Sequence, residues 1–208
     1  STARARRPKL RAGVAWFIDN SFLGDGVADE SAVHSLTSPP IQIPPDAVAP
    51  RVAFTHFMES EAALDGGNLK VCIVGGNCQL VPRTAFHFNP YNGRLFTTAR
   101  GSTNPLAGEV AWSGAGGRWG TSIAGLDGLV APGDIVQFRF DFSKDHNFGV
   151  TGWYMDDFRV YDCPDCDGDG AADHDEVHFA AASDILSNIG TGVPQSLLLI
   201  APPQARGE

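Results

Sequence analysis

Residues 151–176 read TGWYMDDFRVYDCPDCDGDGAADHDE, and the rest of the chain can be interpreted outward from this stretch. Its first half is rich in aromatic and β-branched side chains, which are typical of a β-strand: Trp153, Tyr154, Phe158, Val160 and Tyr161. Acidic residues then dominate, with nine of them between Asp156 and Glu176. The stretch therefore predicts a strand that leads directly into an acidic loop.

The acidic half has the spacing of a twelve-residue calcium loop. Oxygen donors would come from positions 1, 3, 5, 7, 9 and 12, which are Asp165, Asp167, Asp169, Ala171, Asp173 and Glu176. Such a loop must turn sharply so that its oxygens converge on a hard dication, and Gly170 at position 6 permits that turn. We expect calcium as the cofactor, with a solvated acidic linker as the alternative. Because a strand precedes it, the loop resembles the single-loop calcium repeats of dockerin-like and thrombospondin type 3 segments.

The four cysteines form two local pairs. Cys72 and Cys78 flank a glycine-containing turn, so a hairpin would place them opposite each other and predicts a disulfide. Cys163 and Cys166 lie at the start of the calcium loop, and a structural disulfide is favoured there over a redox pair or a four-cysteine zinc site. Two disulfides indicate an oxidising compartment, so we expect a secreted, extracellular protein.

Composition and charge exclude some classes of function. The 208-residue chain has a formal net charge of -9, which argues against nucleic-acid binding because that depends on Lys and Arg neutralising phosphates. No apolar run approaches the roughly 20 residues of a membrane span, so none is predicted. Residues 1–11 form a basic arm that contains five of the fifteen Lys and Arg residues.

Many short strands separated by Gly, Pro and Asn turns predict an all-β fold, a jelly-roll β-sandwich. The clearest strand is Asp134–Ser143, where apolar and polar residues alternate. Another segment, Leu36–Ile43, predicts an edge strand interrupted by prolines, and Asp19–Ser35 is expected to be a polar loop. The predicted organisation is a basic arm at 1–11, a sandwich at 12–162 and a calcium-loop segment with a helix and tail at 163–208.

Five blocks of sequence carry a family resemblance: LTSPPIQI, FTHFMESEAALDGGNLKV, EVAWSGAGGRWGTSIAGL, VQFRFDFSKD and GWYMDDFRVYD. In order and spacing they resemble the jelly-roll domain of immune inhibitor A-type secreted bacterial proteases, over residues 12–162. The resemblance implies a non-catalytic domain similar to MAM-like and carbohydrate-binding sandwiches, with structural calcium. After Gly76 the chain departs from the family pattern, because it carries the Cys78 segment where the family has a Trp.

A second calcium site is predicted where Glu59, Glu61 and Asp65 share one turn. The family order would place Asp156 and Asp157 nearby, and clustered carboxylates repel one another unless a cation joins them. The alternative is that these are solvated turn acids.

Catalytic chemistry is not expected. His174 and His178 have the spacing of a zinc-peptidase motif, but Asp175 replaces its catalytic Glu and no third ligand is evident. The predicted function is therefore not enzymatic.

Aromatic residues offer a candidate ligand site. We expect Trp112, Trp119 and Trp153 to pack in the core, whereas Phe88 and Tyr91 lie in the longest Gly, Asn and Pro-rich loop and could stack on sugars.

These expectations combine into a secreted, calcium-binding module for attachment to extracellular polysaccharide or a cell surface. One alternative is a self-assembling structural subunit, a homo-oligomer or filament that uses its termini, with Ser196–Ile200 (SLLLI) as a donated strand. A second alternative is an excised accessory domain of a secreted hydrolase.

Overall fold

The computed structural model describes residues 15–20, 29–146 and 149–165, and these residues form an all-β fold. Within them, only two short 3-10 helices interrupt the strands: η1 (Arg83–Ala85) and η2 (Thr98–Arg100). The strands are β1 (Trp16–Asp19), β2 (Ala32–Thr37), β3 (Ile41–Gln42), β4 (Pro50–Glu59), β5 (Gly66–Ile73), β6 (Cys78–Leu80), β7 (Phe86–Phe88), β8 (Gly93–Arg94), β9 (Val110–Ala111), β10 (Gly120–Gly125), β11 (Ile135–Lys144) and β12 (Gly152–Asp162). The predicted all-β class is confirmed.

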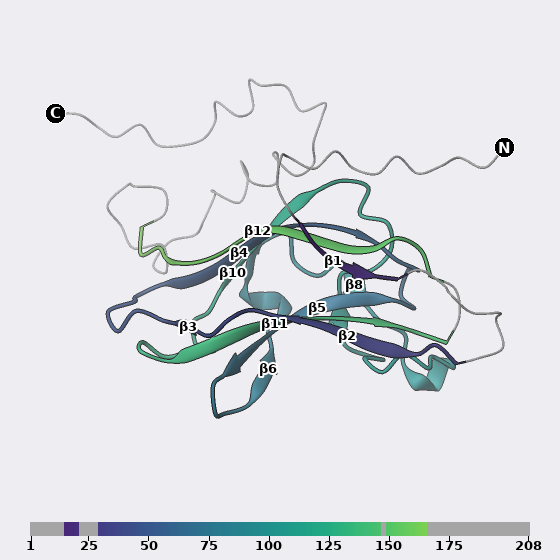
Figure 1. Cartoon of the computed structure of the whole chain (residues 1–208), viewed down its shortest axis with the longest axis horizontal. Coiled ribbons are helices and arrows are strands. Elements are labelled where there is room, and N and C mark those ends of the chain that lie inside the picture. The colour runs from purple at the N-terminus through teal and green to yellow at the C-terminus, as the bar shows by residue number, and fades with distance from the viewer. Residues whose placement is uncertain (1–14, 21–28, 147–148, 166–208) are drawn as a thin grey trace, which may run out of the picture.

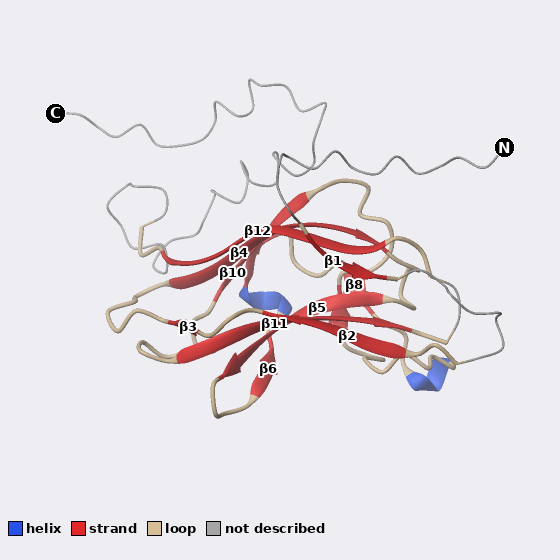
Figure 2. Ribbon diagram, in the orientation of Figure 1, coloured by secondary structure: helices blue, strands red, loops and turns tan. Residues whose placement is uncertain are grey.

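Two antiparallel sheets make up the body of the molecule. The first has the strand order β1-β12-β4-β10-β7, and the second has the order β2-β11-β5-β6, with β3 also paired to β11. Strands β8 and β9 form a small separate ribbon. Figures 1 and 2 show the two sheets as facing layers, with β12, β4 and β10 in one and β11, β5 and β2 in the other.

The core lies between the layers and is largely aromatic. Phe54 on β4 contacts Phe140 on β11 edge to face at a centroid distance of 4.9 Å, and Phe140 contacts Trp153 on β12 at 5.7 Å. Gly67 on β5 lies beneath Trp153, since a Cβ at residue 67 would come within 2.5 Å of the indole ring. Full burial stabilises by about 1.5–3 kcal/mol for each large apolar side chain. The facing aromatic rings therefore hold the two sheets together.

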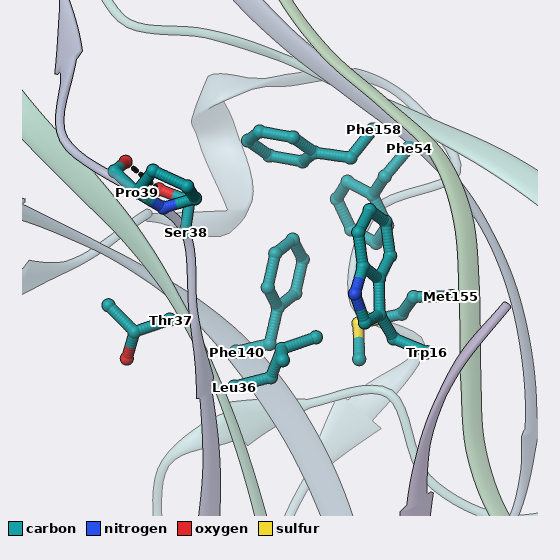
Figure 3. Close-up of a pocket in the computed structure, with 9 residues that line it drawn as sticks. All are labelled: Trp16, Leu36, Thr37, Ser38, Pro39, Phe54, Phe140, Met155 and Phe158. Carbon is teal, nitrogen blue, oxygen red and sulfur yellow. Dashed lines mark hydrogen bonds between the residues drawn. The ribbon is translucent and has the colours of Figure 1, made fainter. Parts of the chain in front are cut away.

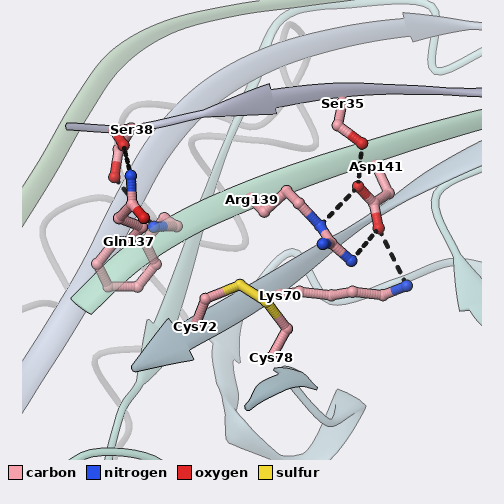
Figure 4. The surroundings of a disulfide bond; sticks show 9 residues. Ser35, Ser38, Lys70, Cys72, Cys78, Gln137, Arg139 and Asp141 are labelled. Atoms are coloured by element: carbon pink, nitrogen blue, oxygen red, sulfur yellow. Dashed lines mark hydrogen bonds and ion pairs between the residues drawn. A yellow bond between two sulfur atoms is a disulfide. The ribbon is translucent and has the colours of Figure 1, made fainter. Parts of the chain in front are cut away.

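Strand β11 follows the predicted alternation along most of its length. Val136, Phe138, Phe140 and Phe142 are buried in the core, while Gln137 and Arg139 are only partly buried. Asp141 is an exception on the polar face, because its side chain is 3% exposed. It accepts hydrogen bonds from Ser35 and Arg139 and pairs with Lys70 Nζ at 3.0 Å, so its charge is compensated (Figure 4).

The β5–β6 hairpin carries the first predicted disulfide. Cys72 and Cys78 are directly paired in the ladder, and their sulfur atoms are bonded (Figure 4). This confirms the prediction, and Gly75 takes the positive φ of 81° that the connecting turn requires.

One predicted boundary is confirmed and another is wrong. The interruption predicted within Leu36–Ile43 is confirmed, since Pro39 and Pro40 separate β2 from β3. Part of the predicted polar loop Asp19–Ser35 belongs to β2, whose residues Val33, His34 and Ser35 are exposed on an edge strand. An edge strand with such little burial carries no alternating pattern, so the sequence gives no strand signal there.

The described residues contain no helix long and apolar enough to cross a membrane. The basic arm at 1–11, the helix predicted after Glu176 and the segment Ser196–Ile200 lie outside the described residues.

Candidate functional site

The predicted calcium loop begins at the last described residue, Asp165. Asp167, Asp169, Ala171, Asp173 and Glu176 lie outside the described residues, as do His174 and His178. The base of the loop is fixed to the sandwich: Asp162 accepts hydrogen bonds from the main-chain N–H groups of Val48 and Ala49, and Cys163 N–H donates to Ala49 O at 3.0 Å. Cys163 is disulfide-bonded, and its predicted partner Cys166 lies outside the described residues.

A group of acidic residues, here called the acidic cluster, lies where β1, β4 and β11 end and β5 and β12 begin. Glu61 and Asp65 come from the β4–β5 turn, Asp145 follows β11, and Asn20 follows β1. Asp65 is fully buried and Asp145 is 4% exposed. Three segments that are far apart in the sequence therefore bring three carboxyl groups and one amide together.

Asp65 is the centre of the acidic cluster. Its Oδ1 accepts a hydrogen bond from the main-chain N–H of Asp145 at 2.9 Å, and its Oδ2 accepts from Asn20 Nδ2 at 3.0 Å. Its main-chain oxygen accepts from Ser60 Oγ at 3.0 Å and Ser113 Oγ at 2.6 Å. The carboxylate is held in place from several sides, so its two oxygens have a fixed direction.

The electrostatics of the acidic cluster favour an added positive charge. Burial, and to a smaller degree the nearby charges of Asp145 and Glu61, raises the pKa of Asp65 to about 6 although two hydrogen bonds oppose the shift. Burial and the charge of Asp145 also raise the pKa of Glu61. Burial is the larger cause of each shift, and repulsion between neighbouring carboxylates adds to it.

Two buried oxygens of the acidic cluster have no hydrogen-bond donor among the described residues. They are Asn20 Oδ1 and Glu61 Oε2. Buried polar atoms in native proteins are normally paired, so each one calls for an explanation. Carboxylate and amide oxygens are the donors that calcium prefers, and the donor set therefore fits a hard dication.

The arrangement is not a finished coordination shell. Within the described part of the chain, no three His, Cys, Asp or Glu side chains are arranged so that they could hold a metal ion. A cation here requires at least one carboxylate to turn inward. Glu61 is the candidate, because it lies on a turn and is only partly buried.

The other acids predicted for the second calcium site do not join the acidic cluster. Glu59 Oε2 accepts a hydrogen bond from Thr151 Oγ1 instead. In the pairing of β4 with β12, Glu59 lies opposite Gly152 and Thr55 lies opposite Asp156. Asp156 is therefore four residues along β12 from the position opposite Glu59. At about 3.3 Å per residue this is a separation of roughly 13 Å. Asp157 follows it and is exposed, so the expectation for Asp156 and Asp157 is wrong.

The expected ligand platform at Phe88 and Tyr91 is also wrong, because both side chains are buried. Phe88 is 5% exposed on β7, and Tyr91 is fully buried, with its hydroxyl oxygen 3.0 Å from Val81 O and 3.2 Å from Leu69 O, either of which can accept its proton. Loop composition predicts the backbone of Tyr91 but not the direction of its ring. Trp112 and Trp153 are buried as expected.

His56 and Ser122 form a close serine–histidine pair. His56 Nε2 lies 2.9 Å from Ser122 Oγ, and Trp153 Nε1 donates to His56 Nδ1 at 3.0 Å. Since Nδ1 accepts, Nε2 carries the proton, and His56 cannot take a proton from Ser122. Burial lowers the pKa of His56 to about 3, and Ser122 is fully buried. This pair is structural.

An apolar pocket of about 100 Å³ opens between β1 and β2. Figure 3 shows the rings of Trp16, Phe54, Phe140 and Phe158 around it. The remaining lining residues are Leu36, Thr37, Ser38, Pro39 and Met155. None of them is titratable, so the pocket offers a small apolar volume without catalytic groups.

Sequence reasoning missed two members of the acidic cluster, Asn20 and Asp145. Neither has a local motif, and 125 residues separate them, so only the folded structure brings them to the same end of the sandwich.

A scan against protein-family models and a search of curated proteins each found no match for this chain.

Proposed function

We propose that this chain is a calcium-stabilised jelly-roll module that acts by binding rather than by catalysis. Its place of action would be extracellular, consistent with the Cys72–Cys78 disulfide, and its partner would be a polysaccharide or a cell surface. The resemblance to the jelly-roll domain of immune inhibitor A-type proteases supports the same role. The acidic cluster would bind one calcium ion, and the loop from Asp165 to Glu176 would bind another.

One observation carries the calcium proposal. Glu61, Asp65 and Asp145 gather at a buried junction where, within the described part of the chain, Asn20 Oδ1 and Glu61 Oε2 have no hydrogen-bond donor. Three negative charges at one point oppose folding, and a dication converts that repulsion into attraction. The ion would be held by the carboxylates of Glu61, Asp65 and Asp145 and by the amide oxygen of Asn20.

Calcium at this position would tie together the segments after β1, β4 and β11. These segments close one end of the sandwich. Calcium would therefore fix that end as well as stabilise the core. No residue of the acidic cluster needs to donate or accept a proton during this task, which separates the proposal from an enzymatic one.

Thermal unfolding of the full chain with and without calcium tests the proposal. Extracellular calcium modules bind with dissociation constants of roughly 0.1–1 mM. At about 5 mM calcium and a dissociation constant of about 0.5 mM, mass action adds about 1.4 kcal/mol to the stability. For a domain of this size the midpoint temperature should rise by about 3–6 °C.

Two variants make the test specific. Glu61→Gln keeps the shape of the side chain but removes its charge, and it should lose most of the calcium-dependent rise. Glu59→Gln is the matched control, because Glu59 bonds Thr151 outside the acidic cluster, and it should keep the rise. A wild-type chain with no rise, or a Glu61→Gln chain with the full rise, contradicts the proposal.

A further inference from the structure

Four aromatic side chains form a continuous row across the outer face of the first sheet. Phe17 on β1 stacks on Tyr154 of β12 with a centroid distance of 4.3 Å and an interplanar angle of 24°. Tyr154 lies 6.2 Å from Phe57 of β4 and 6.3 Å from Trp119, which precedes β10. Phe57 and Trp119 are 6.3 Å apart. We call these four residues the aromatic row.

The aromatic row follows from strand register. Phe17 pairs with Tyr154, and Tyr154 pairs with Phe57, so the side chains lie side by side on one face. Their neighbours along the strands, such as His56 and Trp153, point into the core. The row crosses four strands, a distance of about 14 Å at 4.8 Å per strand.

The aromatic row is accessible, unlike the buried residues Phe88 and Tyr91. Phe17 is 45% exposed, while Phe57, Trp119 and Tyr154 are partly exposed. Large aromatic side chains that gather on a surface mark binding sites, because their burial by a ligand is strongly favourable.

Polar and acidic groups border the aromatic row on both sides. Thr55 and Asp156 form the next cross-strand pair on one side, and Glu59 occupies the other side on β4. Carboxylate and hydroxyl oxygens at these borders can accept hydrogen bonds from sugar hydroxyl groups. The negative charges of Asp156 and Glu59 disfavour an anionic polymer. A neutral sugar chain is complementary to both features, since its C–H faces pack on aromatic rings and its hydroxyl groups reach the borders.

We infer that the aromatic row is the binding surface for a neutral polysaccharide, whose chain lies across the strands and packs on Phe17, Tyr154, Phe57 and Trp119. This inference rests on the proposed binding function and names its ligand class and its surface. It assigns the sugar-stacking role to the outer face of the first sheet, in place of the long loop that contains Tyr91.

Affinity electrophoresis of the full chain through gels containing hydroxyethyl cellulose, a soluble β-1,3-glucan or alginate tests the inference. The neutral polymers should retard the wild-type chain, and anionic alginate should not. Phe17→Ala removes an exposed ring from an edge strand and should weaken binding about tenfold, as expected for one aromatic contact. Tyr154→Phe keeps the ring and should bind nearly as well as the wild type.

Ile135→Ala is the matched control, because Ile135 is 47% exposed on β11 in the other sheet. It should leave retardation unchanged, and the thermal midpoints of all variants should be recorded to show that they fold. Absence of retardation by both neutral polymers, or equal retardation of Phe17→Ala, overturns the inference. Concentration-dependent dimerisation that Phe17→Ala abolishes also overturns it and assigns the face to a second copy. In each case calcium stabilisation would remain, so failure here is distinct from failure of the calcium proposal.

Discussion

Lowering the pH from 7.0 to 4.5 should remove most of the stabilisation that calcium gives to the sandwich. Burial raises the pKa of Asp65 to about 6 in the absence of metal. At pH 4.5 only about 3% of such a group is ionised. Calcium binds the carboxylate and must first displace the proton, so its apparent affinity falls about 30-fold.

The expected magnitude follows from mass action. With about 5 mM calcium and a dissociation constant of about 0.5 mM, the stabilisation is about 1.4 kcal/mol at pH 7.0 and about 0.2 kcal/mol at pH 4.5. Without calcium, the raised pKa of Asp65 acts in the opposite sense. The folded state binds the proton more tightly than the unfolded chain, so ionised Asp65 destabilises by up to about 3 kcal/mol above pH 6. This penalty disappears as the pH falls below about 4.

Urea unfolding followed by tryptophan fluorescence measures these differences, with and without calcium at each pH and at constant ionic strength. Groups that titrate independently of calcium cancel in the difference. Equal stabilisation by calcium at both pH values would refute the assignment of Asp65 as the proton-linked ligand. An Asp65→Asn chain that keeps the full calcium effect at pH 7.0 would refute it as well.

Two further predictions concern the core. Burial lowers the pKa of His56 to about 3 in the folded state, below its ordinary value of 6.5, so this residue should contribute a loss of about 1.4 kcal/mol per pH unit as the pH falls below 6.5. The difference in unfolding free energy between the wild type and His56→Gln, measured by urea unfolding, isolates this contribution from that of Asp65, and a difference that does not change with pH would contradict the buried neutral imidazole. Gly67→Ala should destabilise the fold by about 1–3 kcal/mol, because the added Cβ would lie 2.5 Å from the Trp153 ring. Gly93→Ala is the control, since no atom lies within 4 Å of the added Cβ, and it should change the urea midpoint little. Similar urea midpoints for the two variants would contradict the packing of Gly67 against Trp153.

The sequence predicts the fold well wherever burial leaves a repeating pattern. Strand β11 was expected at Asp134–Ser143 and is found at Ile135–Lys144, because its alternating phenylalanines must face the core. Edge strand β2 was missed over Val33–Ser35, since exposed residues there need no apolar alternation. Side-chain periodicity reports burial, and it is weak where a strand has little to bury.

The candidate site was predicted only in part. Glu61 and Asp65 stand close in the sequence and could be recognised as a pair of acids on one turn. Asp145 and Asn20 reach them through the long-range pairing of β11 with β5 and of β1 with β12, which no local motif encodes. Tyr91 is an error of the opposite kind, because it was selected as a ligand residue but is not one. Its loop-like sequence indicates an exposed side chain, whereas its ring is buried in the core.

The most direct test of the calcium-binding account is the number of calcium ions bound per chain, measured by isothermal titration calorimetry. Asp169→Ala disables the predicted loop at Asp165–Glu176, so this variant should bind one calcium ion where the wild type binds two. Adding Glu61→Gln and Asp145→Asn to it should abolish the remaining binding while the chain stays folded. An Asp169→Ala chain that binds no calcium, or a triple variant that still binds one ion, would contradict the proposed site at Asn20, Glu61, Asp65 and Asp145.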